Sequence, residues 1–167
     1  MSKAFSLAGL RLGWIISNRS VIEECIRHRD YNTISCGLMD DTLATHALLH
    51  VDPLMKRNRQ LVRDNLVILD AWIERNKNKV SYVKPRAGTM ALLRIHALST
   101  DPLSGASDAF CIDLFKQTGV FVAPGRCFDF EGWIRVGYAC ETSMLVAGLE
   151  KLQDYIDRLH ESMATVA

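Results

Sequence analysis

A lysine, two glycines and an arginine follow one another closely at the start of the sequence. Lys3 is followed by Gly9, Arg11 and Gly13. A primary amine can bond reversibly to an aldehyde and then carry a proton, and a guanidinium can bind a phosphate through two parallel hydrogen bonds. The two glycines would let the backbone pass close to a bound molecule. The competing interpretation is a solvated amine beside a chain terminus, followed by an ordinary core strand.

A second arginine, Arg135, lies in the apolar run WIRVG near the other end of the sequence. A guanidinium is planar and is well shaped for bidentate recognition of a carboxylate. Its apolar neighbours Ile134 and Val136 would hold the strand that carries it. Taken alone, the pattern favours an edge-strand arginine that faces water.

The first half of the sequence predicts one strand and three helices. Residues 9–17 form a short apolar run between Gly9 and a polar segment, which is typical of a buried strand. Residues 19–31 and 40–50 are predicted as helices, and Asp52 and Pro53 are suited to start the next one. Apolar side chains recur every three or four residues over 59–76, which predicts a long helix.

The second half of the sequence predicts a small sheet and two helices. The order after the long helix is strand (80–85), strand (89–97), helix (108–117), strand (120–125), strand (133–139) and helix (145–163). Gly119 is suited to end the first of these helices. The order predicts an α/β unit with helices over one face of the sheet. Residues 1–50 do not fit it, so we interpret them as the end of a larger domain.

Composition narrows the classes of function. The 20 basic and 19 acidic residues leave a net charge of +1 without a long single-sign block, which argues against electrostatic binding of nucleic acid or of a membrane surface. The five cysteines are widely spaced and predict reduced, mostly buried thiols in a cytoplasmic protein. His46 and His50 have the spacing of two zinc ligands, but they lack the glutamate and the third ligand of a metal site, so no metal is expected.

The segment from Met1 to Gly13 is similar to the pyridoxal-phosphate attachment signature of class I and II aminotransferases, the fold type I enzymes. Each specified position from Met1 to Gly13 matches. Three further segments resemble the same family: KPRAGTMALLRI resembles the turn and strand that open its small domain, VFVAPGRCF the segment before the carboxylate arginine, and GWIRVGYA the strand that carries this arginine.

The resemblance implies the C-terminal portion of such an enzyme. Residues 1–50 would be the remnant of the cofactor-binding large domain, residues 51–75 a long connecting helix, and residues 76–167 the small C-terminal domain. In this small domain the resemblance implies a small mixed sheet with helices on one face. The fold class is therefore α/β, with an α+β small domain.

The resemblance also implies roles for individual residues. Lys3 would be the catalytic residue, joined to pyridoxal 5'-phosphate as an imine, and the other cofactor-binding residues would be Ser2, Arg11, Tyr31 and Thr33. Arg135 would hold the substrate carboxylate, with Gly88 nearby. The substrates would be an amino acid and a 2-oxo acid. The implied assembly is a homodimer, or an association with a chain that supplies the large domain.

Two alternatives stay open at the level of the sequence. The resemblance covers only about the C-terminal 40% of such an enzyme, so the chain is also consistent with a truncated, non-catalytic remnant or an interaction domain. Other fold type I enzymes, including lyases, decarboxylases and oxidases, share the lysine and both arginines. The sequence therefore does not separate these reactions from amino transfer.

Overall fold

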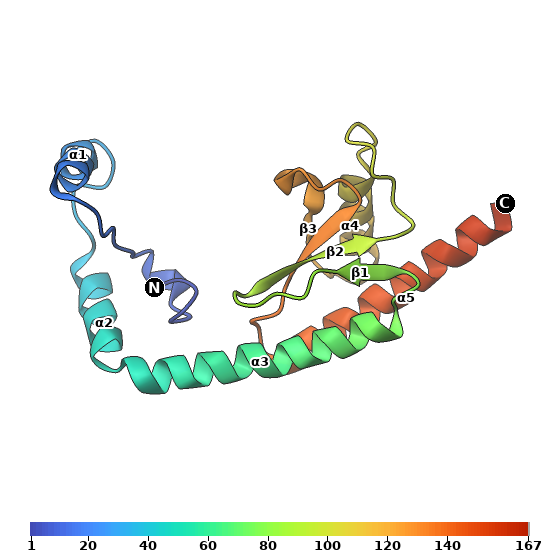
Figure 1. The fold of residues 1–167 in the computed structure, drawn as a ribbon, viewed down its shortest axis with the longest axis horizontal. Helices are drawn as coiled ribbons and strands as arrows, with labels where there is room; N and C mark the ends of the chain where they lie inside the picture. Colours follow the sequence, from blue (N-terminus) through green and yellow to red (C-terminus); the bar gives the residue numbers. More distant parts are fainter. Residues whose placement is uncertain (167) are drawn as a thin grey trace. The chain divides into compact units, whose positions relative to one another are not determined.

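The computed structural model describes the backbone of residues 1–166 and the side chains of residues 1–162. The chain divides into two compact units, Met1–Gln60 and Leu61–Ala167 (Figure 1). Helix α3 (Val51–Arg75) begins in the first unit and ends in the second. The last residue of the helix predicted over 145–163, Met163, has its side chain outside the described ones.

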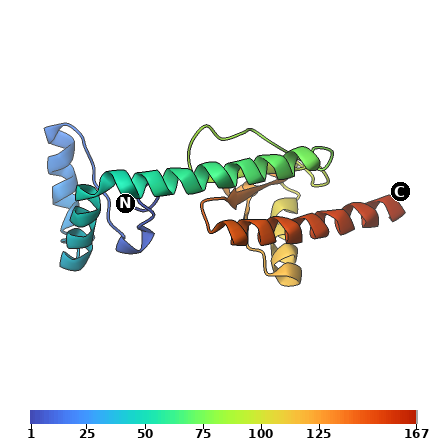
Figure 2. The same ribbon diagram turned by 90° about the horizontal axis from the view of Figure 1, so that it is seen from below.

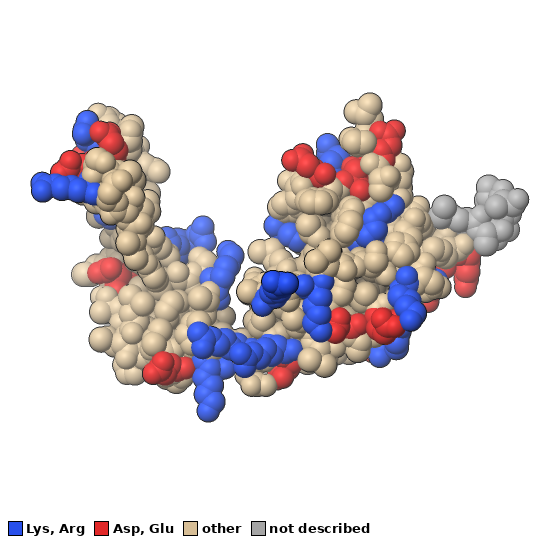
Figure 3. All heavy atoms as spheres, in the orientation of Figure 1, with Lys and Arg blue, Asp and Glu red and all other residues tan. Residues whose placement is uncertain are grey.

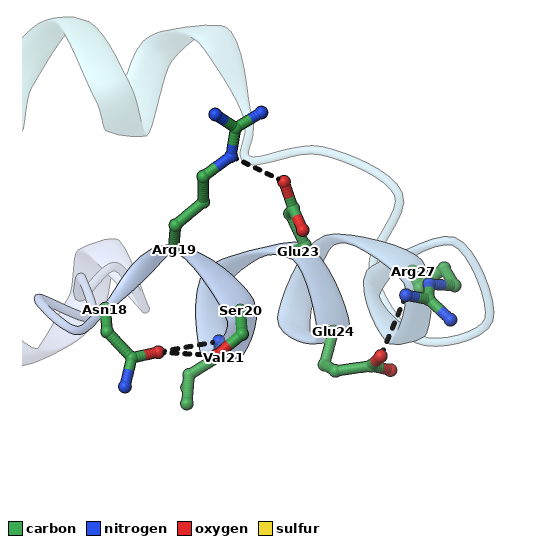
Figure 4. A network of polar contacts seen from close by, with 7 residues as sticks. All are labelled: Asn18, Arg19, Ser20, Val21, Glu23, Glu24 and Arg27. Atoms are coloured by element: carbon green, nitrogen blue, oxygen red, sulfur yellow. Dashed lines mark hydrogen bonds and ion pairs between the residues drawn. The ribbon is translucent and has the colours of Figure 1, made fainter.

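The first unit consists of turns and short helices. A 3-10 turn, η1 (Ala8–Leu10), is followed by α1 (Arg19–Arg29) and α2 (Leu38–Leu49). Helix α1 starts where the side chain of Asn18 accepts a hydrogen bond from the Val21 amide at 3.0 Å, which satisfies one of the free amides at its N-terminus. The ion pairs Arg19–Glu23 and Glu24–Arg27 support its surface (Figure 4).

The strand predicted over residues 9–17 is absent, which corrects that prediction. Residues 11–18 have no regular secondary structure, and Ile16 is 89% exposed. A strand is stabilised by hydrogen bonds to a neighbouring strand, and the described part of the first unit contains no strand that could pair with this run. Apolar composition alone was therefore not enough to predict a strand here.

The second unit contains a four-stranded sheet with the order β1-β2-β4-β3. The strands are β1 (Val80–Tyr82), β2 (Met90–Ile95), β3 (Ala123–Pro124) and β4 (Trp133–Gly137). Every pairing is antiparallel, so the predicted mixed sheet is wrong in this respect. Short connections explain two of the three pairings, because the links from β1 to β2 and from β3 to β4 are too short for the crossover that parallel strands need.

Helices cover one face of this sheet, as predicted. The strands alternate, so that Leu93 and Ile134 point into the core while Leu92 and Arg135 lie on the opposite face. The C-terminal half of α3, together with α4 (Ala106–Thr118) and α5 (Thr142–Val166), closes the core. Figure 2 views the unit from below, with α3 and α5 in front of the strands. One face of the sheet, named the helix-free face below, is thus left free of α-helices in the described part of the chain, and the 3-10 turn η2 (Gly125–Phe128) contacts it through Phe128.

Helix α4 ends as predicted. Gly119 adopts a left-handed conformation (φ 74°), and its amide donates to the carbonyl oxygen of Phe115 at 2.9 Å.

The helices, the surface charges and the cysteines agree in part with what the sequence predicted. No helix among the described residues is long and apolar enough to cross a membrane. In the view of Figure 3, acidic and basic side chains occur on both units. All five cysteines are free, but Cys36 and Cys127 are exposed, so the thiols are less uniformly buried than predicted.

Candidate functional site

Lys3 lies in a series of tight turns that are anchored on both sides of it. The Ser6 amide donates to the Lys3 carbonyl oxygen at 3.1 Å, and the Leu7 amide donates to that of Met1 at 3.4 Å. Phe5 is only 8% exposed, and the Asn58 amide group donates to the carbonyl oxygen of Ala4 at 2.8 Å. The Lys3 side chain is exposed and has no hydrogen bond or ion pair within the described residues. The segment therefore presents a free primary amine on a fixed backbone.

Arg11 follows η1 in a left-handed conformation, with φ 49°, and not in the strand that the sequence predicted. Its backbone amide and its Nη1 both donate to the Ala8 carbonyl oxygen, at 3.3 Å and 3.2 Å. A non-glycine residue in this region is strained by about 1–2 kcal/mol, and these bonds help to hold it there. Most donors of the exposed guanidinium are left for an anion such as a phosphate.

The other predicted cofactor-binding residues are less closely tied to Lys3. Ser2 is half-buried in the first turn, beside Lys3 in sequence. Tyr31 is 91% exposed, and Thr33 is exposed in the turns that follow α1. Their amides donate to the carbonyl oxygens of His28 and Arg29. Within the described residues, the side chains of Tyr31 and Thr33 make no hydrogen bond to Lys3 or Arg11, so their role stays a prediction.

Arg135 lies in β4 on the helix-free face of the sheet. Its register partners are Leu92 in β2 and Ala123 in β3. The guanidinium carbon lies 4.5 Å from the centre of the Phe128 ring, which is a cation–π contact. No carboxylate of the described residues forms an ion pair with Arg135. The side chain is thus oriented by an aromatic ring and is free to bind an anion.

A hollow of about 400 Å³ adjoins Arg135. Its other lining residues are apolar: Val83, Pro85, Met90, Ala91, Leu92, Phe130 and Trp133. The rings of Phe130 and Trp133 meet edge to face with their centres 5.8 Å apart. The sequence pointed to Arg135 but not to these aromatic residues. The available signal was the run RCFDFEGWIR, in which three aromatic side chains precede the arginine.

The loop that carries these aromatic residues is tightly wound. The Phe130 amide donates to the Gly125 carbonyl oxygen at 3.1 Å. A Cβ atom on Gly125 would clash with the Phe130 carbonyl oxygen and lie 2.6 Å from that of Trp133, so only glycine fits there. Arg94 closes the loop from β2 by donating to the carbonyl oxygens of Ile95, Gly132 and Leu98. Burial lowers the pKa of Arg94.

Gly88 lies in the same unit as Arg135 but does not line the hollow. It has φ 97°, a conformation that glycine adopts easily, and its carbonyl oxygen accepts a hydrogen bond from the buried Tyr138 hydroxyl at 2.9 Å. Gly88 lies in the bend before β2, outside the strand that is paired with the Arg135 strand. The hollow beside Arg135 is therefore built without this second predicted substrate residue.

A larger hollow of about 530 Å³ lies elsewhere in the second unit, between the segment after α4 and helix α5. Its lining is apolar except near Lys151, whose amine donates to the Thr118 carbonyl oxygen at 3.0 Å. Because the Lys151 amine is already hydrogen-bonded to the backbone, this hollow is less suited to bind a charged substrate than the hollow at Arg135.

Metal chemistry has no support in the described residues. They contain no group of three or more His, Cys, Asp or Glu side chains that could hold a metal ion. The rings of His46 and His50 lie 4.2 Å apart, but one ring nitrogen of His50 is hydrogen-bonded to the His46 carbonyl oxygen at 2.8 Å.

Comparison with known proteins places the chain in a family. Residues 1–152 match the family model described as "Aminotransferase class I and II". The chain belongs to this aminotransferase family. The chain is 30% identical to capreomycidine synthase of Streptomyces vinaceus, over 92% of its length and 38% of that protein.

Solved structures of the family have the same fold. A PLP-dependent aminotransferase from Streptococcus suis is 37% identical with a TM-score of 0.85, over 95% of this chain and 40% of that one. A PLP-dependent cyclase, OrfR, is 26% identical with a TM-score of 0.87, over 94% of this chain and 41% of the cyclase chain. The chain thus spans about 40% of the length of the family members it matches.

The residues of this family member fit pyridoxal phosphate in chemical type. Lys3 offers an unpaired amine for its aldehyde, and Arg11 offers a guanidinium with unused donors for its phosphate. Both belong to the first unit, whereas Arg135 and Gly88 belong to the second.

Proposed function

We propose that this chain is part of a pyridoxal-phosphate-dependent enzyme that moves an amino group between an amino acid and a 2-oxo acid. The observation that carries the proposal is the free amine of Lys3 on a backbone anchored at Ala4 and Phe5, in a chain of the aminotransferase family. The bound cofactor would supply an electron-withdrawing ring that makes the Cα–H bond of the substrate acidic.

The residues of this chain would act around that chemistry. The amine of Lys3 would hold the cofactor by its aldehyde carbon, and after release would carry a proton to and from the substrate Cα. Arg11 would bind the phosphate, with Ser2 beside Lys3 and with Tyr31 and Thr33 reaching the phosphate of a neighbouring subunit. Arg135 would hold the substrate carboxylate, and Gly88 would shape the backbone nearby.

The assembly and location are part of the proposal. The assembly would be a homodimer, or an association with a chain that supplies the large domain. The five free thiols favour the cytoplasm, where cysteines stay reduced.

Covalent labelling tests the role of Lys3. The chain would be incubated with a limiting amount of pyridoxal phosphate, reduced with borohydride and mapped by peptide mass spectrometry. We expect most of the label on Lys3, its loss in Lys3→Ala, and unchanged labelling in Lys77→Ala, which removes an exposed lysine paired with Glu74. Label spread evenly over the exposed lysines would contradict the proposal.

The same experiment with pyridoxal, which lacks the phosphate, tests Arg11. We expect the chain to label more readily with pyridoxal phosphate than with pyridoxal, and Arg11→Gln to lose this preference while still reacting at Lys3. An unchanged preference in Arg11→Gln would remove this arginine from the proposed site.

A second candidate reaction has a specific observation in its favour. The relatives include a capreomycidine synthase and a cyclase besides aminotransferases. A reaction of that kind would use Lys3 and Arg135 in the same way but would need no 2-oxo acid as the second substrate. Amino-group transfer to an added 2-oxo acid by the full-length enzyme would separate the two.

A further inference from the structure

The surroundings of Arg135 carry information on the substrate that the arginine alone does not. In β4 the side chains of Trp133 and Arg135, two positions apart, both lie on the helix-free face of the sheet. Leu92 lies opposite Arg135 on that face, and Met90 precedes it by two residues in β2. The arginine is therefore bordered by large apolar side chains from two adjacent strands.

The contact with Phe128 leaves the arginine able to bind a carboxylate. The guanidinium carbon lies 4.5 Å from the ring centre, so the ring contacts the guanidinium through its flat face. The five N–H donors of a guanidinium lie in its plane and point away from such a contact. The ring thus orients Arg135 while its hydrogen-bonding edge stays available for a bidentate carboxylate.

The hollow beside Arg135 has a suitable size for one small molecule. Its volume of about 400 Å³ lies at the lower end of the ~300–1,000 Å³ range of ligand pockets. Val83, Pro85, Met90, Leu92, Phe130 and Trp133 line it, together with Ala91 and Arg135. An apolar group that enters it would bury surface against two aromatic rings.

The charges around the hollow argue against acidic and basic side chains. An acidic side chain would need a second cation, and the nearby Arg94 already donates to three backbone carbonyl oxygens. A basic side chain would need a carboxylate, and neither Asp nor Glu lines the hollow. Arg135 is the one charged residue of the lining.

We infer that this site selects a substrate whose carboxylate binds Arg135 and whose side chain is apolar and of aromatic size. The inference rests on the proposed function, since it assigns the side-chain class of that substrate. Phe128 would act as a positioning residue for Arg135, and Phe130 and Trp133 would determine specificity.

Ligand binding to the cofactor-free chain tests this inference without any catalytic readout. The chain would be titrated with 3-phenylpropanoate, propanoate and succinate, and amide and indole NMR shifts would be followed. We expect 3-phenylpropanoate to bind in the millimolar range or tighter and about tenfold tighter than propanoate, since a buried phenyl group adds more than ~1.4 kcal/mol. Succinate should bind no better than propanoate.

Matched variants separate the two parts of the site. Arg135→Gln should abolish binding of all three carboxylates, whereas Arg75→Gln, which removes an exposed arginine at the end of α3, should leave it unchanged. Trp133→Leu should remove most of the preference for the phenyl group and keep propanoate binding. Phe128→Leu should weaken all three ligands by a similar factor, because it acts through Arg135.

Several outcomes would overturn the inference. Equal affinities for 3-phenylpropanoate and propanoate, tighter binding of succinate, or no shift of any signal near Trp133 would each do so. The labelling of Lys3 by pyridoxal phosphate is measured separately, so loss of selectivity here would leave the proposed reaction standing, and a failure of the labelling would be seen as a distinct result.

Discussion

The side-chain amide of Asn58 donates a hydrogen bond to the carbonyl oxygen of Ala4, 2.8 Å away. This contact links the residue after Lys3 to helix α3, 54 positions further along the chain. Asn58 is 7% exposed, and its own oxygen accepts two hydrogen bonds from Arg57, both at 3.1 Å. This contact fixes the position of the backbone that carries the Lys3 amine. A fixed position is important for an amine that must react with one particular atom of a ligand.

Replacing Asn58 by alanine should loosen the Lys3 turn without unfolding the unit. The Ala4 carbonyl oxygen would lose its donor, at a cost of about 1 kcal/mol, so hydrogen exchange at the Ser6 amide should become about fivefold faster. Asn32→Ala is the matched control, because Asn32 is exposed and its side chain has no hydrogen bond within the described residues. Equal exchange at Ser6 in both variants would show that Asn58 does not hold this turn.

Gly125 should tolerate no larger residue. In Gly125→Ala the new methyl group would meet the carbonyl oxygens of Phe130 and Trp133, so the loop that carries Phe128 would have to move. We expect a loss of about 1–3 kcal/mol in the free energy of unfolding, measured with urea, and weaker binding of carboxylates at Arg135. Gly148→Ala serves as control, since its Cβ meets nothing within 4 Å and alanine favours a helix. Similar midpoints for the two variants would contradict this prediction.

The elements of the second unit were predictable because each is marked by its own residues. The spacing of Leu145, Leu149 and Leu152 indicates one buried face, and these residues are 4%, 5% and 2% exposed in α5. Gly119 marked the end of α4 correctly. The periodicity of apolar residues and the capping of helices depend on residues that are close together in the sequence. They can therefore be recognised without knowing the rest of the fold.

The structure of the first unit was less predictable, because a strand depends on a partner far away in sequence. The run around Ile15 and Ile16 has the composition of a strand, yet these residues are 62% and 89% exposed. The hollow at Arg135 was missed for a related reason. It is formed by β2, β4 and the loop around Phe130, and their pairing register cannot be derived from any one of these segments.

Asp70 provides a pH-dependent contribution to the stability of the second unit. One of its carboxylate oxygens accepts a hydrogen bond from the Tyr82 hydroxyl at 2.6 Å, and the other accepts one from the Lys84 amine at 2.5 Å. The bond from Lys84 is the main cause that lowers the pKa of Asp70, and the bond from Tyr82 adds to it. The contact joins α3 to β1 and to the residues after it.

Asp70→Asn should therefore lower the free energy of unfolding at pH 7 by about 0.5–1 kcal/mol, the range of a partly exposed ion pair. The folded carboxyl group has a lower pKa than the unfolded one, so the stabilisation is complete above about pH 4–5 and is lost as the pH falls through the folded value. The difference between the parent chain and Asp70→Asn should consequently shrink as the pH falls below the unfolded pKa of about 4, and it should also shrink at high salt. Urea unfolding at several pH values measures it, with Asp154→Asn, an exposed acid of α5, as control. A difference that stays constant from pH 7 to acid would mean that Asp70 acts by packing and not by its charge.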